Sequence, residues 1–121
     1  YKRQVMRFEN GYIYEGNWKE GKRNGVGKAT FTDGMVYEGD YLDGQRHGIG
    51  TITLSDGFKY TGDWEYGEIT GVGIATYANG DTYQGSFVKG KRQGRGTIKF
   101  ASGDSASGKW DDGALVETGS D

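Results

Sequence analysis

The stretch YEGNWKEGKRNGVG, residues 14–27, decides the fold of this chain because its frame returns along nearly the whole sequence. Its opening triplet recurs every 23 residues, as Tyr37-Glu38-Gly39, Tyr60-Thr61-Gly62, Tyr83-Gln84-Gly85 and a decayed Ala106-Ser107-Gly108. A fixed period without insertions is typical of one small supersecondary unit stacked on copies of itself. The fold and the function should therefore both be sought in the single repeat.

The composition is rich in glycine and aromatic residues. The chain has 24 Gly, no Pro and no Cys, with 33% hydrophobic and 14% aromatic residues. We expect one soluble domain with a shallow, local core, because aliphatic residues are too few for two packed layers. The lack of cysteine excludes disulfides and thiolate metal sites. The net charge of −2, with both signs interspersed, does not favour a nucleic-acid partner.

The location expected from the sequence is the cytoplasm. No apolar run approaches the length that spans a bilayer, and no signal peptide is seen. Because the sequence starts at Tyr1 rather than at a methionine, we expect it to be part of a longer protein. Membrane association would then come from a partner or from the rest of that longer chain.

Each repeat contains two runs with strand character. In the first complete repeat these are residues 14–18 and 25–31, and we expect residues 19–24 to form a long hairpin loop between them. A tighter return follows at residues 32–34, where Asp precedes Gly, and Asn, Asp or Ser precedes Gly in the other returns. This pattern predicts three-residue loops, each closed by a left-handed glycine in a G1 bulge.

Side-chain parity selects one register for the whole sheet. The predicted pairs are Phe31–Met35, Ala29–Tyr37, Gly27–Gly39 and Gly25–Tyr41 across the three-residue loop, and Trp18–Gly25, Gly16–Gly27 and Tyr14–Ala29 across the long loop. This register places a row of glycines between two rows of rings on one face and sends most charged residues to the other face. Rings that lean over positions without Cβ can bury aromatic area in a single layer. We therefore predict an all-β fold: a single-layer, elongated antiparallel sheet of tandem β-hairpins, about ten strands, curved with an aromatic and glycine concave face.

The repeat at residues 14–27 resembles the MORN repeat family (membrane occupation and recognition nexus), and the resemblance covers residues 8–110. It implies elongated hairpin ribbons without catalytic activity, used for protein docking, oligomerisation and phospholipid association. It divides one domain, residues 1–121, into an N-terminal half-repeat 1–13, repeats 14–36, 37–59, 60–82 and 83–105, and a degenerate C-terminal cap 106–121. Residues 1–8 could add a further strand ahead of residues 12–18.

The sequence shows no catalytic constellation. His47 is the only histidine, and we interpret it as a solvated residue of the second long hairpin loop. Asp33 and Asp56 are turn formers, and Asp111-Asp112 matches no calcium-loop spacing. The Gly-x-Gly matches lie in predicted strands rather than before a helix, so they are not phosphate cradles. We therefore predict no enzymatic activity, no cofactor and no metal.

The aromatic rows have three interpretations. They can be the core alone, since a one-layer fold has nowhere else to bury apolar area. They can also form a trough that seats a peptide, a helix or another protomer, because rigid rings bind at low entropic cost. The predicted groove residues are Tyr14, Trp18, Tyr37, Tyr41, Tyr60, Trp64, Tyr83, Phe87 and Trp110.

The third interpretation is phospholipid binding through basic residues near the long hairpin loops. The candidate headgroup residues are Lys22, Arg23, Arg46, Lys91, Arg92 and Arg95. Glu68 and Ile69 interrupt this stripe in the third repeat, and acidic residues interleave elsewhere, so the loop edge carries mixed charge. We therefore favour a protein partner over a membrane, and we expect no nucleic-acid partner.

Overall fold

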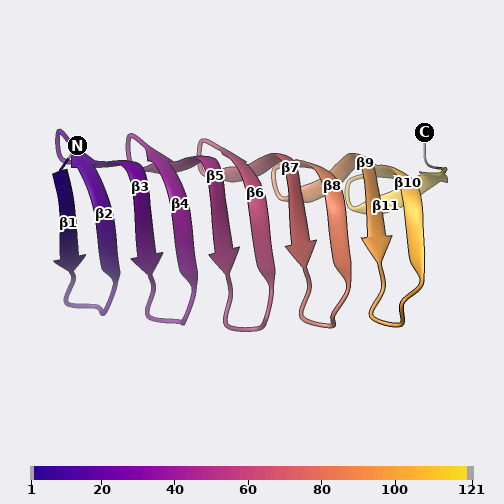
Figure 1. The fold of residues 1–121 in the computed structure, drawn as a ribbon, viewed down its shortest axis with the longest axis horizontal. Helices are drawn as coiled ribbons and strands as arrows, with labels where there is room; N and C mark the ends of the chain where they lie inside the picture. Colours follow the sequence, from indigo (N-terminus) through magenta and orange to yellow (C-terminus); the bar gives the residue numbers. More distant parts are fainter. Residues whose placement is uncertain (1, 120–121) are drawn as a thin grey trace.

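The computed structural model describes residues 2–119, which form one antiparallel sheet of eleven strands in sequence order (Figure 1). The strands are β1 Lys2–Arg7, β2 Ile13–Lys19, β3 Lys22–Thr30, β4 Val36–Leu42, β5 Gln45–Thr53, β6 Lys59–Glu65, β7 Glu68–Thr76, β8 Thr82–Val88, β9 Lys91–Lys99, β10 Ser105–Asp111 and β11 Ala114–Thr118. The predicted single-layer sheet of tandem hairpins is confirmed, with eleven strands where about ten were expected. The N-terminal segment pairs with β2 as β1, while Tyr1 lies outside the described residues.

The three-residue loops follow the prediction, and they form the lower edge of the sheet in Figure 1. In the loop after β3, the Phe31 N–H donates to the Met35 carbonyl at 2.8 Å and the Gly34 N–H donates to the Phe31 carbonyl at 3.1 Å. Gly34 has a φ of 93°, the left-handed conformation that favours glycine. The Asp33 carboxylate accepts the Met35 N–H at 2.9 Å, which explains an Asp before the Gly.

The opposite edge differs from the prediction. Only Glu20 and Gly21 join β2 to β3, and both have positive φ, 52° and 81°. Asp43-Gly44, Tyr66-Gly67, Lys89-Gly90 and Asp112-Gly113 repeat this geometry. Positive φ at both central residues marks type I′ turns, whose twist matches that of antiparallel strands. The predicted six-residue loops are therefore wrong, and residues 22–24 belong to β3.

A β-bulge in these hairpins also corrects the predicted register. Gly16 pairs with Gly27 as predicted, but Trp18 pairs with Arg23 instead of Gly25. The extra residues bulge at Gly25, whose φ of 77° is rarely adopted by residues with a side chain. The equivalent pairs are Tyr41–Arg46, Trp64–Ile69 and Phe87–Arg92. The bulge therefore brings a row of arginines opposite the rings.

Each two-residue turn after the first is tied to the repeat before it. The Asn24 side-chain oxygen accepts the Asp43 N–H at 3.0 Å, and the Arg23 carbonyl accepts the Gly44 N–H at 2.8 Å. The equivalent acceptors are His47 for Tyr66, Thr70 for Lys89 and Gln93 for Asp112. His47 is therefore a partly buried residue of β5 that accepts from the next turn, which corrects its interpretation as a solvated loop residue.

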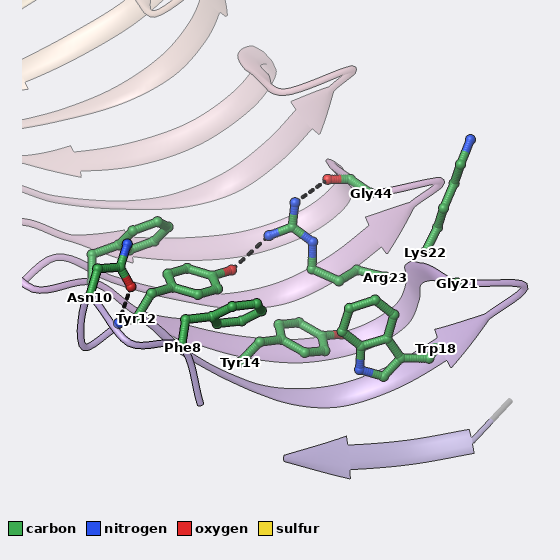
Figure 2. A pocket seen from close by; sticks show the side chains of 10 residues that line it. Phe8, Asn10, Tyr12, Tyr14, Trp18, Gly21, Lys22, Arg23 and Gly44 are labelled. Carbon is green, nitrogen blue, oxygen red and sulfur yellow. Dashed lines mark hydrogen bonds between the residues drawn. The ribbon is translucent and has the colours of Figure 1, made fainter. Parts of the chain in front are cut away.

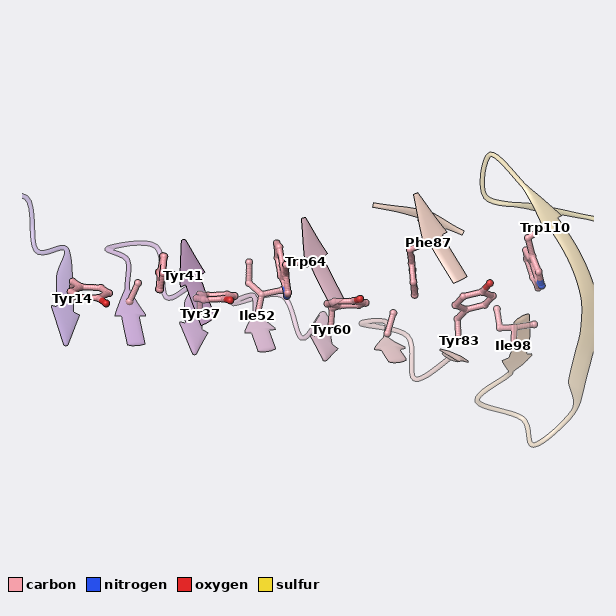
Figure 3. Close-up of a cluster of buried hydrophobic side chains, with 12 residues drawn as sticks. Tyr14, Tyr37, Tyr41, Ile52, Tyr60, Trp64, Tyr83, Phe87, Ile98 and Trp110 are labelled. Atoms are coloured by element: carbon pink, nitrogen blue, oxygen red, sulfur yellow. The ribbon is translucent and has the colours of Figure 1, made fainter. Parts of the chain in front are cut away.

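The core is one layer of rings on one face. Tyr14, Tyr37, Tyr60 and Tyr83 are 0% exposed, and they alternate with Tyr41, Trp64, Phe87 and Trp110 along the sheet (Figure 3). Neighbouring rings meet edge to face, with centroids 5.0–5.8 Å apart. Each buried tyrosine lies over a glycine of the next strand, and a Cβ on Gly27 would collide with the Tyr14 hydroxyl. The predicted row of glycines is thus required by sterics.

Candidate functional site

The predicted groove residues come together, but mainly as the ring layer rather than as an open surface. Of the nine, the four core tyrosines are fully buried and Tyr41, Trp64, Phe87 and Trp110 are only 4–5% exposed. Trp18, near the N-terminal end, is partly exposed. The hydroxyls of the four tyrosines donate to the carbonyls of Asn17, Asp40, Asp63 and Ser86 at 2.7–3.0 Å. The accessible surface on this side of the sheet is therefore formed mainly by the side chains above these rings.

Three arginines lie above the ring layer, on the same face. The Arg23 guanidinium carbon is 5.1 Å from the Tyr41 ring centroid, that of Arg46 is 5.3 Å from Trp64, and that of Arg92 is 4.7 Å from Trp110. These distances are within the range of cation–π attraction. Each arginine contacts a ring of its own repeat and a ring of the next repeat, so it joins neighbouring repeats.

The three arginines differ in their hydrogen bonds. Arg23 donates to the Tyr12 hydroxyl at 2.7 Å and to the Gly44 carbonyl at 2.9 Å, and Arg92 donates to the Gly113 carbonyl at 2.7 Å. Within residues 2–119, the Arg46 guanidinium donates no hydrogen bond, and the ion pairs there are Arg3–Glu15 and Lys91–Asp112. No carboxylate of the described chain therefore neutralises the arginine row.

We call this surface the trough: the arginine row, Ile69 at the equivalent position of the third repeat, and an apolar rim near the three-residue loops. The rim residues are Phe8, Tyr12, Phe31, Met35, Leu54, Phe58 and Tyr77. Figure 2 shows the strands bending, with the side chains at the N-terminal end on the inner side of the bend. The concave aromatic face predicted from the sequence is therefore present.

Hollows open along the trough among residues 2–119. The hollow near β2 has a volume of about 540 Å³ and is lined by Phe8, Tyr12, Trp18, Phe31 and Arg23 among others (Figure 2). The central hollow, about 380 Å³, is lined by Arg46, Ile52, Leu54, Phe58, Trp64 and Ile69, with Glu68 and Lys89 at its rim. Both combine apolar walls with a guanidinium, which is the composition of sites that bind an apolar group and an acceptor together.

Burial fixes the protonation state of the ring layer. It raises the pKa of Tyr41 and that of Tyr60 from 10.0 to about 12, with the charges of Tyr12 and Asp63 adding to the respective shifts. Burial likewise raises the pKa of Tyr37 and Tyr83. These hydroxyls stay protonated donors at neutral pH and offer no nucleophile or base.

The repeats match a known family. The family model described as MORN repeat matches residues 14–36, 37–59, 60–82 and 83–105. The chain belongs to the MORN-repeat family. MORN repeats are generally non-catalytic modules that mediate protein or membrane interactions. No curated protein matches this sequence closely enough to count as a relative.

The six candidate headgroup residues are spread over different surfaces of the MORN-repeat sheet. Arg23, Arg46 and Arg92 lie in the trough, over the rings. Lys22 and Lys91 are exposed beside the two-residue turns, and Lys91 pairs with Asp112 at 2.8 Å. Arg95 follows the bulge glycine and is exposed on the opposite face, where it pairs with Lys109 in the register. The structure therefore does not gather them into one patch.

Across the MORN repeats that the structure describes, residues 2–119, no group of three or more His, Asp or Glu residues is placed to hold a metal ion. The same part of the chain has no helix long and apolar enough to cross a membrane. The acidic residues instead serve local structure: Asp40 and Asp63 accept the N–H groups of Ile49 and Val72 at the bulges, at 3.0 and 2.9 Å.

Proposed function

We propose that this chain is a non-catalytic interaction module that seats a protein segment, whether a peptide, a helix or another protomer, along the trough. The observation that carries the proposal is the pair of hollows above the ring layer, where apolar walls lie beside guanidinium groups. Arginine and aromatic residues dominate binding energy at protein interfaces. Because edge-to-face contacts and backbone hydrogen bonds hold the rings, an occupant would lose little free energy in ordering the surface.

Phospholipid association is the weaker alternative. Attraction to anionic membranes is worth about 1 kcal/mol for each basic residue near the surface, so it needs several cations that face the membrane together. The six candidates face in different directions, and Glu68 replaces a lysine at the third turn. The charge distribution therefore supports a protein occupant better than a lipid surface.

The test is a random-peptide display selection on the folded chain. We expect selected peptides to lose about tenfold or more in affinity when Leu54 and Phe58 are both changed to alanine, because these side chains wall the central hollow. The matched control changes Ile49 and Val72, which are 62% and 60% exposed on the opposite face, to alanine. Circular dichroism would verify that both variants fold. Failure to select any binder, or equal losses in the two variants, would overturn the proposal.

A further inference from the structure

We propose that the centre of the trough recognises an acidic side chain beside an apolar one, so that the segment it seats carries Asp or Glu next to a large aliphatic or aromatic residue. This inference rests on the proposed function, because it specifies the chemistry of the same occupant. The acidic side chain is bound by the guanidinium of Arg46. The apolar side chain enters the hollow around Ile69.

The first half of the subsite is a guanidinium with unused donors. Arg46 lies in β5, partly exposed, and its guanidinium carbon is 5.3 Å from the ring centroids of both Tyr37 and Trp64. A guanidinium has five N–H donors in a fixed fork. Within the described chain Arg46 uses none of them in a hydrogen bond, whereas Arg23 and Arg92 are each anchored to a carbonyl of the next turn.

The rings attract the Arg46 guanidinium without accepting a conventional hydrogen bond from it, so the N–H edge of its fork remains available. A carboxylate matches that edge, because it can accept two parallel hydrogen bonds from the fork. Glu68 lines the same hollow, but it forms no ion pair with Arg46, since the ion pairs among residues 2–119 are Arg3–Glu15 and Lys91–Asp112. An incoming Asp or Glu would therefore not have to displace an internal carboxylate from Arg46.

The second half of the subsite is apolar because the third repeat departs from the others. Ile69 occupies the position that Arg23, Arg46 and Arg92 hold, and it pairs with Trp64 in the register. With Ile52, Leu54 and Phe58 it walls the hollow of about 380 Å³. Arg46 lines the same hollow, so the two halves of the subsite adjoin across Trp64. At the rim, Glu68 and Lys89 are exposed and carry opposite charges.

A side-chain carboxylate fits this geometry better than a phosphate. A phosphate group carries more charge than a carboxylate and is favoured by several convergent cations. Arg23 is two strands from Arg46, or about 10 Å at the usual strand spacing, and Arg92 is about 19 Å away. The guanidinium groups are thus spread along the trough, so each one could bind a different acidic residue of an elongated occupant. A second acidic residue about 10 Å from the first would reach Arg23.

The experiment uses peptides from the display selection described above. We expect Asp or Glu beside a large apolar residue to be enriched among trough-dependent binders. A synthetic binder and its Glu→Gln or Asp→Asn analogue would be titrated against the wild type, Arg46→Met, Arg46→Lys, Ile69→Ala and Arg95→Met. Arg95→Met removes the same charge from the opposite face and is the matched control.

The expected result is a loss of about tenfold for Arg46→Met, and a similar loss when the acidic residue of the peptide is neutralised. The two changes together should cost no more than either alone, because they remove the same contact. Arg46→Lys should recover part of the affinity, Ile69→Ala should weaken binding through the apolar residue, and Arg95→Met should bind within about twofold of the wild type.

Three results would overturn the inference. Trough-dependent peptides that lack acidic residues and bind Arg46→Met normally would refute it while leaving the proposed function intact. Equal losses for Arg46→Met and Arg95→Met would show that only the net charge matters. Vesicles of phosphatidylcholine and phosphatidylserine that bind the wild type but not Arg46→Met, without any acidic peptide doing so, would assign Arg46 to a lipid headgroup.

Discussion

The concave side of the sheet has two layers that differ in what they contact. The deep layer consists of the glycine row and the buried rings, and its four core tyrosines are 0% exposed with their hydroxyls bonded to the backbone. The upper layer consists of the arginines, Ile69 and the apolar rim, which are partly exposed. In a one-layer fold the core is only one side chain deep. We therefore expect the residues next to the sheet to determine stability and the residues farther above it to be available for binding.

The largest effect is expected from a substitution in the deep layer. A Cβ at Gly39 would lie 2.6 Å from the Ile49 carbonyl oxygen and 3.0 Å from the Tyr37 hydroxyl, and it would collide with the Gly50 Cα. Because backbone atoms of a paired strand cannot give way, we expect Gly39→Val to cost about 4 kcal/mol or more, or to prevent folding, despite the higher strand propensity of valine. Urea denaturation followed by circular dichroism measures this cost.

The matched control places valine on the exposed face. Thr53 lies in β5 with its side chain exposed, so Thr53→Val should change the free energy of unfolding by less than about 0.5 kcal/mol. A Gly39→Val variant as stable as Thr53→Val would contradict the assignment of the glycine row to the floor beneath the rings.

The deep layer should also make the fold sensitive to alkali. Burial raises the pKa of Tyr41 and Tyr60 from 10.0 to about 12. Below pH 10 these tyrosines are protonated in both the folded and the unfolded chain, so their ionisation does not reduce the free energy of unfolding. Above pH 10 the unfolded chain releases these protons first, so each such tyrosine lowers the free energy of unfolding by up to about 1.4 kcal/mol per pH unit until its folded pKa is reached.

Urea midpoints measured between about pH 8 and 11.5 would show this decline. In Tyr60→Phe the urea midpoint should fall less steeply with pH, because that variant has one fewer tyrosine to ionise. Midpoints that do not change with pH over this range would show that the rings are exposed to water.

The two layers also differ in how far the sequence predicts them. The deep layer follows from side-chain parity, because the 23-residue period fixes which Gly and Tyr share a face. In the upper layer, the positions of the arginines and Ile69 over the rings were missed, because the parity argument assumed unbroken strands, and the bulge at Gly25 shifts Arg23 to the ring face. The dipeptides Asp43-Gly44 and Asp112-Gly113 are typical of two-residue turns and could have indicated the shorter loop.

Within the deep layer, the tryptophans at the end and at the centre should respond differently. The Trp64 indole N–H donates to the Gly50 carbonyl at 3.0 Å, whereas the buried Trp18 indole nitrogen has no hydrogen-bond partner. Changing each to phenylalanine removes the same atoms, but Trp64 is more deeply buried than Trp18, and only Trp64→Phe also removes a buried hydrogen bond. We expect Trp64→Phe to destabilise by about 1–2 kcal/mol more than Trp18→Phe in chemical denaturation. Equal losses would mean that neither the deeper burial of Trp64 nor its hydrogen bond adds to stability.

The smallest expected effect separates two arginines of the upper layer. Arg23→Met loses hydrogen bonds to Tyr12 and to the Gly44 carbonyl, in addition to its stacking on Tyr41. Arg46→Met loses stacking alone, and the methionine can still pack on the Trp64 ring. We therefore expect Arg23→Met to cost about 1–2 kcal/mol of unfolding free energy and Arg46→Met less than about 1 kcal/mol. If Arg46→Met proved the more destabilising of the two, Arg46 would belong with the deep layer. Its guanidinium would then stabilise the sheet rather than serve as an available hydrogen-bond donor for a bound carboxylate.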